Sequence, residues 1–245
     1  MATYSVYFSP TGNTKKSVLS MAQAICGEPK EIDLTLPACE TAAFGEDDFV
    51  IFGAPVYGGR IPAAAMQRLQ GFRGSGTPCI LVACYGNRHY DDALLELSDF
   101  AKAHGFIVKG AAATVGRHTF GHIQEHRPDE ADLQKNAAFV KAALVNDREV
   151  TIPGSRPYKD GGSGGKFRPS TLESCVKCGL CKRSCPMGAI GEDCASIDDS
   201  KCLACFRCIR ICPKGAKAMV SEAYDSFAEG FSAKLSEARE NEYFI

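Results

Sequence analysis

A run of four cysteines that occurs twice is the feature of this chain that most limits its possible structures. The first run has cysteines at 175, 178, 181 and 185, and the second has them at 202, 205, 208 and 212, an offset of 27 residues. Proline follows the last cysteine of both runs, and Gly-Ala begins two residues after that proline. The segment is therefore an internal duplication whose thiols either bind metal or form disulfides.

The cellular compartment decides between these two uses of cysteine. The N-terminus lacks the basic start and apolar stretch of a signal peptide, so we expect a cytoplasmic chain with reduced thiols. Zinc needs only four ligands and would leave the third cysteine of each triplet unused. A spacing of two, two and three residues closed by Cys-Pro is the arrangement that holds a 4Fe-4S cluster. The two runs predict two such clusters.

The region from about 171 to 220 resembles bacterial two-cluster ferredoxins over its whole length. The resemblance implies crossed ligation, in which each run gives three thiolates to one cluster and its last thiolate to the other. One cluster would then take Cys175, Cys178, Cys181 and Cys212, and the second Cys202, Cys205, Cys208 and Cys185. Cys194 lies outside the pattern and is interpreted as a free thiol.

Basic residues outnumber acidic ones around these cysteines. Residues 166–220 contain ten Lys/Arg and five Asp/Glu, which suits two buried anionic clusters. The bases inside or beside the runs would steer an acidic redox partner if they face solvent; they are Lys182, Arg183, Arg207 and Arg210.

The first 150 residues alternate between two apolar patterns. Short apolar, β-branched runs at 3–8, 30–34, 49–53, 78–83 and 106–114 predict strands. Helical spacing predicts helices at 14–26, 63–71, 91–105 and 128–145, with Gly105 closing the third and Pro128 opening the fourth. Five strands alternating with helices predict a doubly wound parallel sheet, whose ligand binds beyond the carboxyl ends of the strands.

The segment between the first strand and the first helix, Ser9-Pro10-Thr11-Gly12-Asn13-Thr14, has the parts of a phosphate site. It offers hydroxyls, a glycine and free amides at a helix N-terminus. It lacks the spacing of a dinucleotide loop and of a nucleoside triphosphate loop, so neither NAD nor ATP is favoured. The alternative is a polar turn that only caps the helix.

Residues 7–14, with the sequence YFSPTGNT, resemble the phosphate loop of flavodoxins, usually written T-x-T-G-N-T. The resemblance covers about 145 residues and implies a flavodoxin-like sheet with strand order 2-1-3-4-5. It also implies FMN, whose phosphate would lie on Ser9, Thr11, Gly12, Asn13 and Thr14. The family's two ring-binding loops match Pro55, Val56, Tyr57, Gly58 and Gly59 after the third strand, and Tyr85, Gly86, Asn87, Arg88 and Tyr90 after the fourth.

Two departures from the flavodoxin pattern concern the phosphate and the flavin ring. Proline at position 10 removes one backbone donor, and the chain has no tryptophan to stack on the ring. Tyr57, Tyr85 and Tyr90 are the available aromatic faces, although each could instead be a boundary residue of the core. Arg60 and Arg88 either face the flavin or pair with Asp91 or Asp92.

The loop at 115–127 contains three of the five histidines, at 118, 122 and 126. On a helix this spacing would suggest zinc, but Gly121 and the missing apolar stripe argue against a helix. We expect a lid beside the flavin, with His118 as the candidate for contact with the flavin or with a substrate proton.

The pattern divides the chain into four parts. These are a flavodoxin-like domain at 1–152, a Gly/Pro-rich linker at 153–170 that either hangs free or lies on a surface, the ferredoxin-like α+β domain at 171–220, and a C-terminal stretch at 221–245. The last has aromatic or apolar residues at 224, 227, 231 and 235, which predicts an acidic amphipathic helix. We expect it to pack at the domain interface, the alternative being a partner-binding tail.

Both halves together are similar to a family of flavodoxin-ferredoxin fusion proteins from anaerobes, regarded as electron-transfer proteins. That resemblance implies an electron carrier with one FMN and two 4Fe-4S clusters that relays low-potential electrons between redox partner proteins. The alternatives are a flavin-dependent reductase of a quinone or nitroaromatic, and a redox sensor. With 28 basic and 29 acidic residues and no membrane-spanning apolar run, we expect neither nucleic-acid binding nor membrane insertion.

Overall fold

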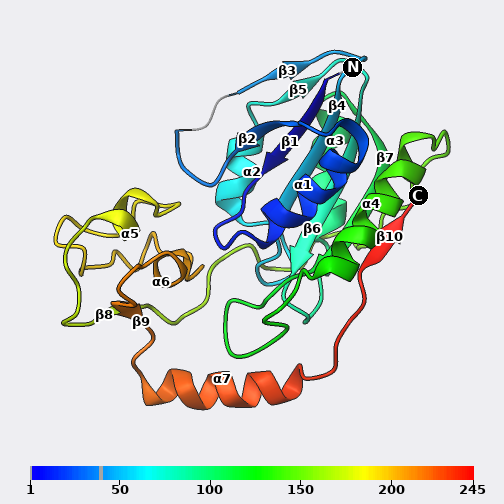
Figure 1. Cartoon of the computed structure of the whole chain (residues 1–245). Coiled ribbons are helices and arrows are strands. Elements are labelled where there is room, and N and C mark those ends of the chain that lie inside the picture. Colours follow the sequence, from blue (N-terminus) through cyan, green and yellow to red (C-terminus); the bar gives the residue numbers. More distant parts are fainter. Residues whose placement is uncertain (1, 39–40) are drawn as a thin grey trace.

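The computed structural model describes residues 2–38 and 41–245, and its first part is an α/β domain on one six-stranded sheet (Figure 1). Its strands are β1 (Thr3–Tyr7), β2 (Lys30–Asp33), β4 (Phe49–Pro55), β6 (Thr77–Tyr85), β7 (Phe106–Val115) and β10 (Glu242–Phe244). They lie in the order β10-β7-β6-β4-β1-β2, and only β10 is antiparallel to its neighbour. The five parallel strands therefore have the order 2-1-3-4-5, which confirms the predicted flavodoxin-like sheet.

Helices cover both faces of this sheet. They are α1 (Asn13–Cys26) and α4 (Glu130–Leu144) on one face, and α2 (Ala63–Leu69) and α3 (Ala93–Ala103) on the other. Along β4, Phe49 and Ile51 pack with α1 and α4, whereas Val50 and Phe52 pack with α2 and α3. A strand buried on both faces needs an apolar side chain at every position, which explains the continuous apolar run. A separate parallel pair joins β3 (Ala43–Phe44) to β5 (Arg73–Gly74).

Two predicted helix ends can be compared with the structure. Gly105, after α3, has φ +83°, and a Cβ there would lie 2.2 Å from the Gly74 carbonyl oxygen, so glycine is required. Helix α4 begins two residues after Pro128, because Asp129 is its N-cap. The Asp132 amide donates to Asp129 Oδ1 at 3.0 Å, and the Asp129 amide donates to Asp132 Oδ2 at 2.9 Å.

The glycine-rich linker lies along the α/β domain. The amides of Ser155 and Lys159 donate to the two carboxylate oxygens of the buried Asp92 at 2.9 and 2.8 Å. Farther along, the Gly162 amide donates to the Tyr57 carbonyl at 2.8 Å. The linker is therefore held in place by its backbone and adds a wall to the first domain.

The cysteine-rich part is a small α+β unit with internal symmetry. It contains an antiparallel pair, β8 (Ser170–Thr171) with β9 (Lys217–Ala218), and two one-turn helices, α5 (Leu180–Arg183) and α6 (Arg207–Arg210). Helix α6 repeats α5 at the 27-residue offset, and the left-handed φ of 53° at Lys177 recurs as 50° at Ala204. The duplication in sequence is thus also a duplication of the backbone.

The C-terminal prediction was only half correct. Helix α7 (Glu222–Lys234) ends well before the C-terminus, and the chain then returns to the first domain as β10. Strand β10 pairs with β7, with Glu242 opposite Ala113 (Figure 1). The outer edge of β7 offers unpaired backbone groups, and pairing with them outweighs the local helical preference. No helix within the described ranges is long and apolar enough to cross a membrane.

Candidate functional site

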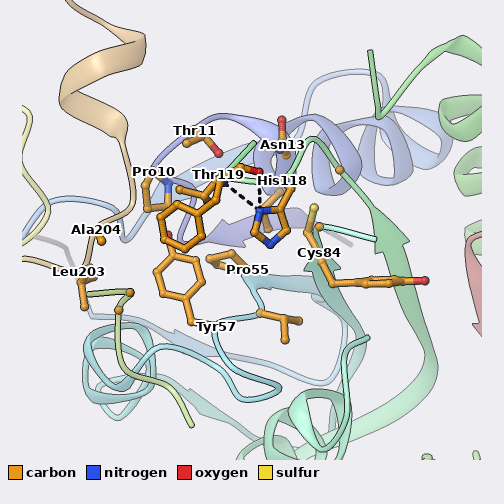
Figure 2. Close-up of a pocket in the computed structure, with 18 of the residues that line it drawn as sticks. Pro10, Thr11, Asn13, Pro55, Tyr57, Cys84, His118, Thr119, Leu203 and Ala204 are labelled. Carbon is orange, nitrogen blue, oxygen red and sulfur yellow. Dashed lines mark hydrogen bonds between the residues drawn. The ribbon is translucent and has the colours of Figure 1, made fainter. Parts of the chain in front are cut away.

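A cavity of about 320 Å³, here called the strand-end cavity, lies at the carboxyl ends of the parallel strands. This volume is within the range of small-molecule sites. Loops after β1, β4, β6 and β7 form most of its wall, and Leu203 and Ala204 of the cysteine-rich domain complete it (Figure 2). The predicted cofactor-binding residues that line it are Ser9, Thr11, Asn13, Thr14, Pro55, Val56, Tyr57, Gly58, Tyr85 and Gly86.

The turn that begins at Ser9 presents free backbone donors to this cavity. Gly12 has φ +91°, and the amides of residues 11–14 have no acceptor among the described residues. The Ser9 hydroxyl accepts the Lys15 amide at 3.0 Å, and the Asn13 side-chain amide donates to the Arg117 carbonyl at 2.9 Å. Free amides at a helix N-terminus suit a phosphate group. The turn therefore fits a phosphate through its backbone, while Ser9 and Asn13 hold its shape.

Tyr57 lies on a tight two-residue turn at the end of β4. Gly58 and Gly59 have φ of 63° and 92°, and the Tyr57 amide donates to the Arg60 carbonyl at 2.8 Å. This turn places the Tyr57 ring in the cavity (Figure 2). Burial, together with the nearby Cys205 and Cys202 thiols, raises the pKa of the Tyr57 hydroxyl well above its usual range. Tyr57 is thus a neutral aromatic face beside the cysteine-rich domain.

The structure does not bring five predicted residues into the lining of the cavity: Gly12, Gly59, Asn87, Arg88 and Tyr90. Asn87 is buried and donates to the carbonyls of Leu235 and Glu237 at 2.9 and 2.8 Å. The Tyr90 hydroxyl donates to the Glu242 carboxylate at 2.8 Å. These side chains hold the C-terminal segment, whose return to the sheet was not predicted, and this is why they face away from the cavity.

Arg60 and Arg88, which were expected either to face the flavin or to pair with an aspartate, both form ion pairs. Nε and Nη2 of Arg60 each donate to the Glu96 carboxylate at 2.8 Å. Arg88 pairs with Asp91, as one of the two sequence interpretations proposed. Neither arginine lines the strand-end cavity.

His118 is a neutral donor at the cavity wall. The Phe120 amide donates to its Nδ1 at 2.8 Å, so Nδ1 is an acceptor and Nε2 carries the proton. Burial lowers the pKa of His118 to about 4. Figure 2 shows the other ring nitrogen of His118 on the side of the ring opposite the dashed hydrogen bonds, and His118 lines the cavity. A Cβ on Gly86 would lie 2.3 Å from the His118 ring, so glycine is needed there.

The other two histidines of this loop do not join His118. His122 lies 3.1 Å from Glu125, and His126 lies 3.9 Å from Asp129. The loop is not helical, as predicted. Within the residues that the structure describes, no three histidine, cysteine or carboxylate side chains are placed to hold a single metal ion.

The eight cysteines of the two runs surround two separate cavities. The distal cavity is lined by Cys175, Cys178, Cys181 and Cys212, and the proximal cavity by Cys185, Cys202, Cys205 and Cys208. These are the two crossed sets that the ferredoxin resemblance implies. Leu203 and Ala204 line both the proximal cavity and the strand-end cavity. Cys194, buried and outside both sets, also lies at the distal cavity.

Burial makes two of the proximal thiols less acidic. It raises the pKa of Cys205 to about 11 and that of Cys208 to about 12. Thiols of this kind become thiolates only when a cation replaces the proton. Four soft donors around each cavity therefore fit a cluster that supplies its own positive iron ions.

Arginines join the two domains through backbone carbonyls. Arg207 Nη1 donates to the Pro10 carbonyl at 2.8 Å, and Arg68 Nη2 donates to the Pro186 carbonyl at 2.6 Å. Arg210 Nη2 is 3.5 Å from the His118 carbonyl. Of the four basic residues considered as steering charges, Arg207 and Arg210 are thus interface residues. Lys182 pairs with Glu192.

Helix α7 places its aromatic face on the domain interface, as expected. Tyr224 and Phe227 contact Phe167 of the linker with ring centroids 5.2 and 5.1 Å apart. Phe120 of the 115–127 loop contacts Phe206 of the cysteine-rich domain at 5.1 Å. We call this group the aromatic seam; it contains Phe120, Phe167, Phe206, Tyr224, Phe227 and Phe231. It holds the loop of His118 against both domains.

Comparisons with known proteins found similarities to separate parts of the chain. Residues 170–220 match the family model of the 4Fe-4S dicluster domain. Similar solved structures include a flavodoxin from the domain Archaea (15% identity, 59% of this chain and 97% of that chain, TM-score 0.43). Oxidised flavodoxins 1 and 2 from Bacillus cereus are 16% and 14% identical, cover 59% of this chain and 97% and 98% of theirs, and have TM-scores of 0.46 and 0.45. No curated protein matches the chain.

The fold and the two cysteine cavities define a chain with an N-terminal flavodoxin-like domain and a C-terminal 4Fe-4S dicluster domain. The dicluster domain with its eight cysteines implies two 4Fe-4S clusters.

Proposed function

We propose that this chain is an electron-transfer protein that couples one FMN to two 4Fe-4S clusters and relays low-potential electrons between redox partner proteins. One observation carries the proposal: Leu203 and Ala204 line both the strand-end cavity and the proximal cysteine cavity. A cofactor in the first would be separated from a cluster in the second by one layer of residues. FMN, when bound, accepts two electrons and can release them singly, whereas each cluster carries one.

The strand-end cavity suits FMN at both of its ends. The free amides of residues 11–14 would hold the phosphate, and Tyr57 would supply an aromatic face for the ring. Phe120 of the 115–127 loop and Gly165 of the linker also line the cavity, so both segments form part of its wall. We place this electron-transfer protein in the cytoplasm, where the thiols stay reduced, and assign it neither a nucleic-acid nor a membrane partner.

The first experiment is anaerobic purification, with iron, sulfide and flavin measured on one sample. We expect about eight irons and one FMN per chain, all reduced in linked steps during a spectroscopic titration. Two clusters without flavin, even after FMN is added, would contradict the FMN half of the proposal.

A charge substitution tests the phosphate position. In Thr11→Glu a carboxylate would face the FMN phosphate, and we expect the Kd for FMN, measured by flavin fluorescence quenching, to rise at least about tenfold. Thr151→Glu introduces the same charge at an exposed position that does not line the cavity. Equal Kd values for the two variants would place the phosphate elsewhere.

His118 favours a second candidate function, a flavin-dependent reductase of a quinone or nitroaromatic. Its neutral ring places an N–H donor at the cavity wall, where it could hydrogen-bond a small oxidant. Steady-state turnover of a quinone that is lost in His118→Ala, with FMN content unchanged, would favour the reductase over the carrier. A redox sensor gains no support from α7, because its aromatic face is packed in the aromatic seam.

A further inference from the structure

The two cysteine cavities differ in their access to solvent. At the proximal cavity, Ala204 and Phe206 are buried, and Arg207 holds this side against the Pro10 carbonyl of the first domain. At the distal cavity, Cys178 is exposed and Val176 is 61% exposed. Figure 1 shows α6 on the side of the α/β domain and α5 beyond it. Among the described ligand cysteines, Cys178 of the distal cavity is the one that is exposed, whereas the four cysteines of the proximal cavity are partly buried.

We propose that the rim of the distal cavity is the docking surface for a redox protein that presents carboxylates around its own one-electron centre. This inference rests on the proposed electron-transfer function. One electron would cross per encounter: a reduced cluster held by the distal cysteines would give it to the partner's oxidised centre, or an oxidised cluster would take it from a reduced partner. Electrons from a proximal cluster, or from a cofactor in the strand-end cavity, would reach the partner through the distal cavity.

The charge of the rim determines which charge the partner's docking surface must carry. Lys177 and Lys214 both line the distal cavity, both are exposed, and neither forms an ion pair within the described residues. Arg183 is exposed too and donates to the Cys178 carbonyl at 3.1 Å, which places its charge beside the exposed cysteine. Glu173 is the single acidic residue in segments 172–183 and 212–217. Glu192 and Asp193 precede Cys194, which also lines the cavity, and Glu192 is paired with Lys182. The rim is thus basic, although the whole chain has a net charge of −1.

The rim also has exposed apolar side chains that a partner protein could contact. Val176 stands between two cluster cysteines in the chain, and Leu172, 39% exposed, lies near the start of the same loop. In transient complexes charge complementarity raises the encounter rate, and exposed apolar side chains beside the cluster cysteines add contact area.

The test uses the full chain with both clusters and FMN, whose content is measured first. The reduced protein is mixed in a stopped-flow instrument with tris(oxalato)cobaltate(III), a trianion, or with hexaamminecobalt(III), a trication; each accepts one electron. The variant Lys177→Glu/Lys214→Glu is compared with Lys141→Glu/Arg148→Glu. The latter makes the same charge change at exposed residues of the α/β domain.

We expect the rim variant to react about tenfold more slowly with the trianion and faster with the trication, and the control to change less than twofold. Binding of redox-inert tris(oxalato)chromate(III) to the oxidised protein, followed by calorimetry, should weaken in the rim variant alone. Equal changes in both variants, or none in either, would overturn the docking surface. A sample with normal iron and FMN and linked reduction would in that case leave the proposed function standing, whereas absent FMN would refute that function separately.

Discussion

Several polar residues around the strand-end cavity form hydrogen bonds within the protein. Ser9 accepts the Lys15 amide, and Asn13 donates to the Arg117 carbonyl, so both are already engaged before any ligand binds. Asn87 accepts the Arg239 amide at 2.8 Å and thereby fixes the C-terminal segment. Groups that remain for a ligand include backbone N–H groups, the Thr11 hydroxyl, the Tyr57 ring and the His118 Nε2–H. Residue type alone therefore overstates how many side chains are free to bind a cofactor.

His118 predicts a dependence of stability on pH. Burial lowers its pKa in the folded protein to about 4, below about 6.5 in the unfolded chain. The unfolded chain then binds more protons between these values, so stability is full above the unfolded pKa and falls as pH falls toward 4, by at most about 1.4 kcal/mol per pH unit. We expect wild-type Tm to drop more between pH 7.5 and 5.5 than that of His118→Phe. The exposed His126→Phe should behave as wild type; parallel curves for all three would show that His118 does not titrate this way.

At the scale of elements, the unexpected feature is the return of the chain as β10. Asn241, just before it, is buried, and both the oxygen and the nitrogen of its side-chain amide form hydrogen bonds. Its Oδ1 accepts the Val115 amide at 2.8 Å, and its Nδ2 donates to Asp132 Oδ1 at 3.1 Å. The strand is short, and this one side chain connects it to β7 and to the Arg127–Asp132 ion pair. The connection keeps the far end of α7 attached to the first domain.

Asn241→Ala should therefore destabilise the protein far more than a neighbouring surface change. Removing the side chain leaves the buried Val115 amide without an acceptor, which costs about 2 kcal/mol and lowers Tm by about 4 to 8 °C. Glu240→Ala, which removes only an exposed ion pair with Lys135, is the matched control and should shift Tm by less than about 3 °C. Thermal unfolding followed by circular dichroism measures both. Equal Tm values would mean that the hydrogen bonds of the Asn241 side chain do not stabilise the protein.

At the scale of the whole molecule, the two domains pack against each other, and residues of both line the strand-end cavity. The linker, α7 and the 115–127 loop all meet in the aromatic seam, and the arginine contacts to Pro10 and Pro186 add polar links. The strand-end cavity exists in this form only because Leu203 and Ala204 close one side of it. The order from strand-end cavity to proximal cavity to distal cavity follows from this packing.

Pairs of cysteine substitutions test the crossed sets. If Cys175 and Cys212 serve one cluster, Cys175→Ser/Cys212→Ser should keep about four irons per chain, because only the distal cluster is lost. Cys175→Ser/Cys185→Ser should keep almost none, since it damages both sets. Iron and sulfide analysis of anaerobic samples gives the counts. The reverse result, with about four irons in the second variant and none in the first, would mean that each run holds its own cluster.

The sequence alone determined the parallel sheet, its helices and the eight cysteines, because apolar periodicity and fixed cysteine spacing are local properties that survive in any context. It also placed the turn at residues 9–14 and Tyr57 at one cavity, since the carboxyl ends of parallel strands lie at the same edge of the sheet. It did not reveal β10, the burial of Asn87 and Tyr90, or the neutral state of His118. Only the tertiary structure decided these, and the order of the two cysteine cavities, because each depends on which distant segments pack together.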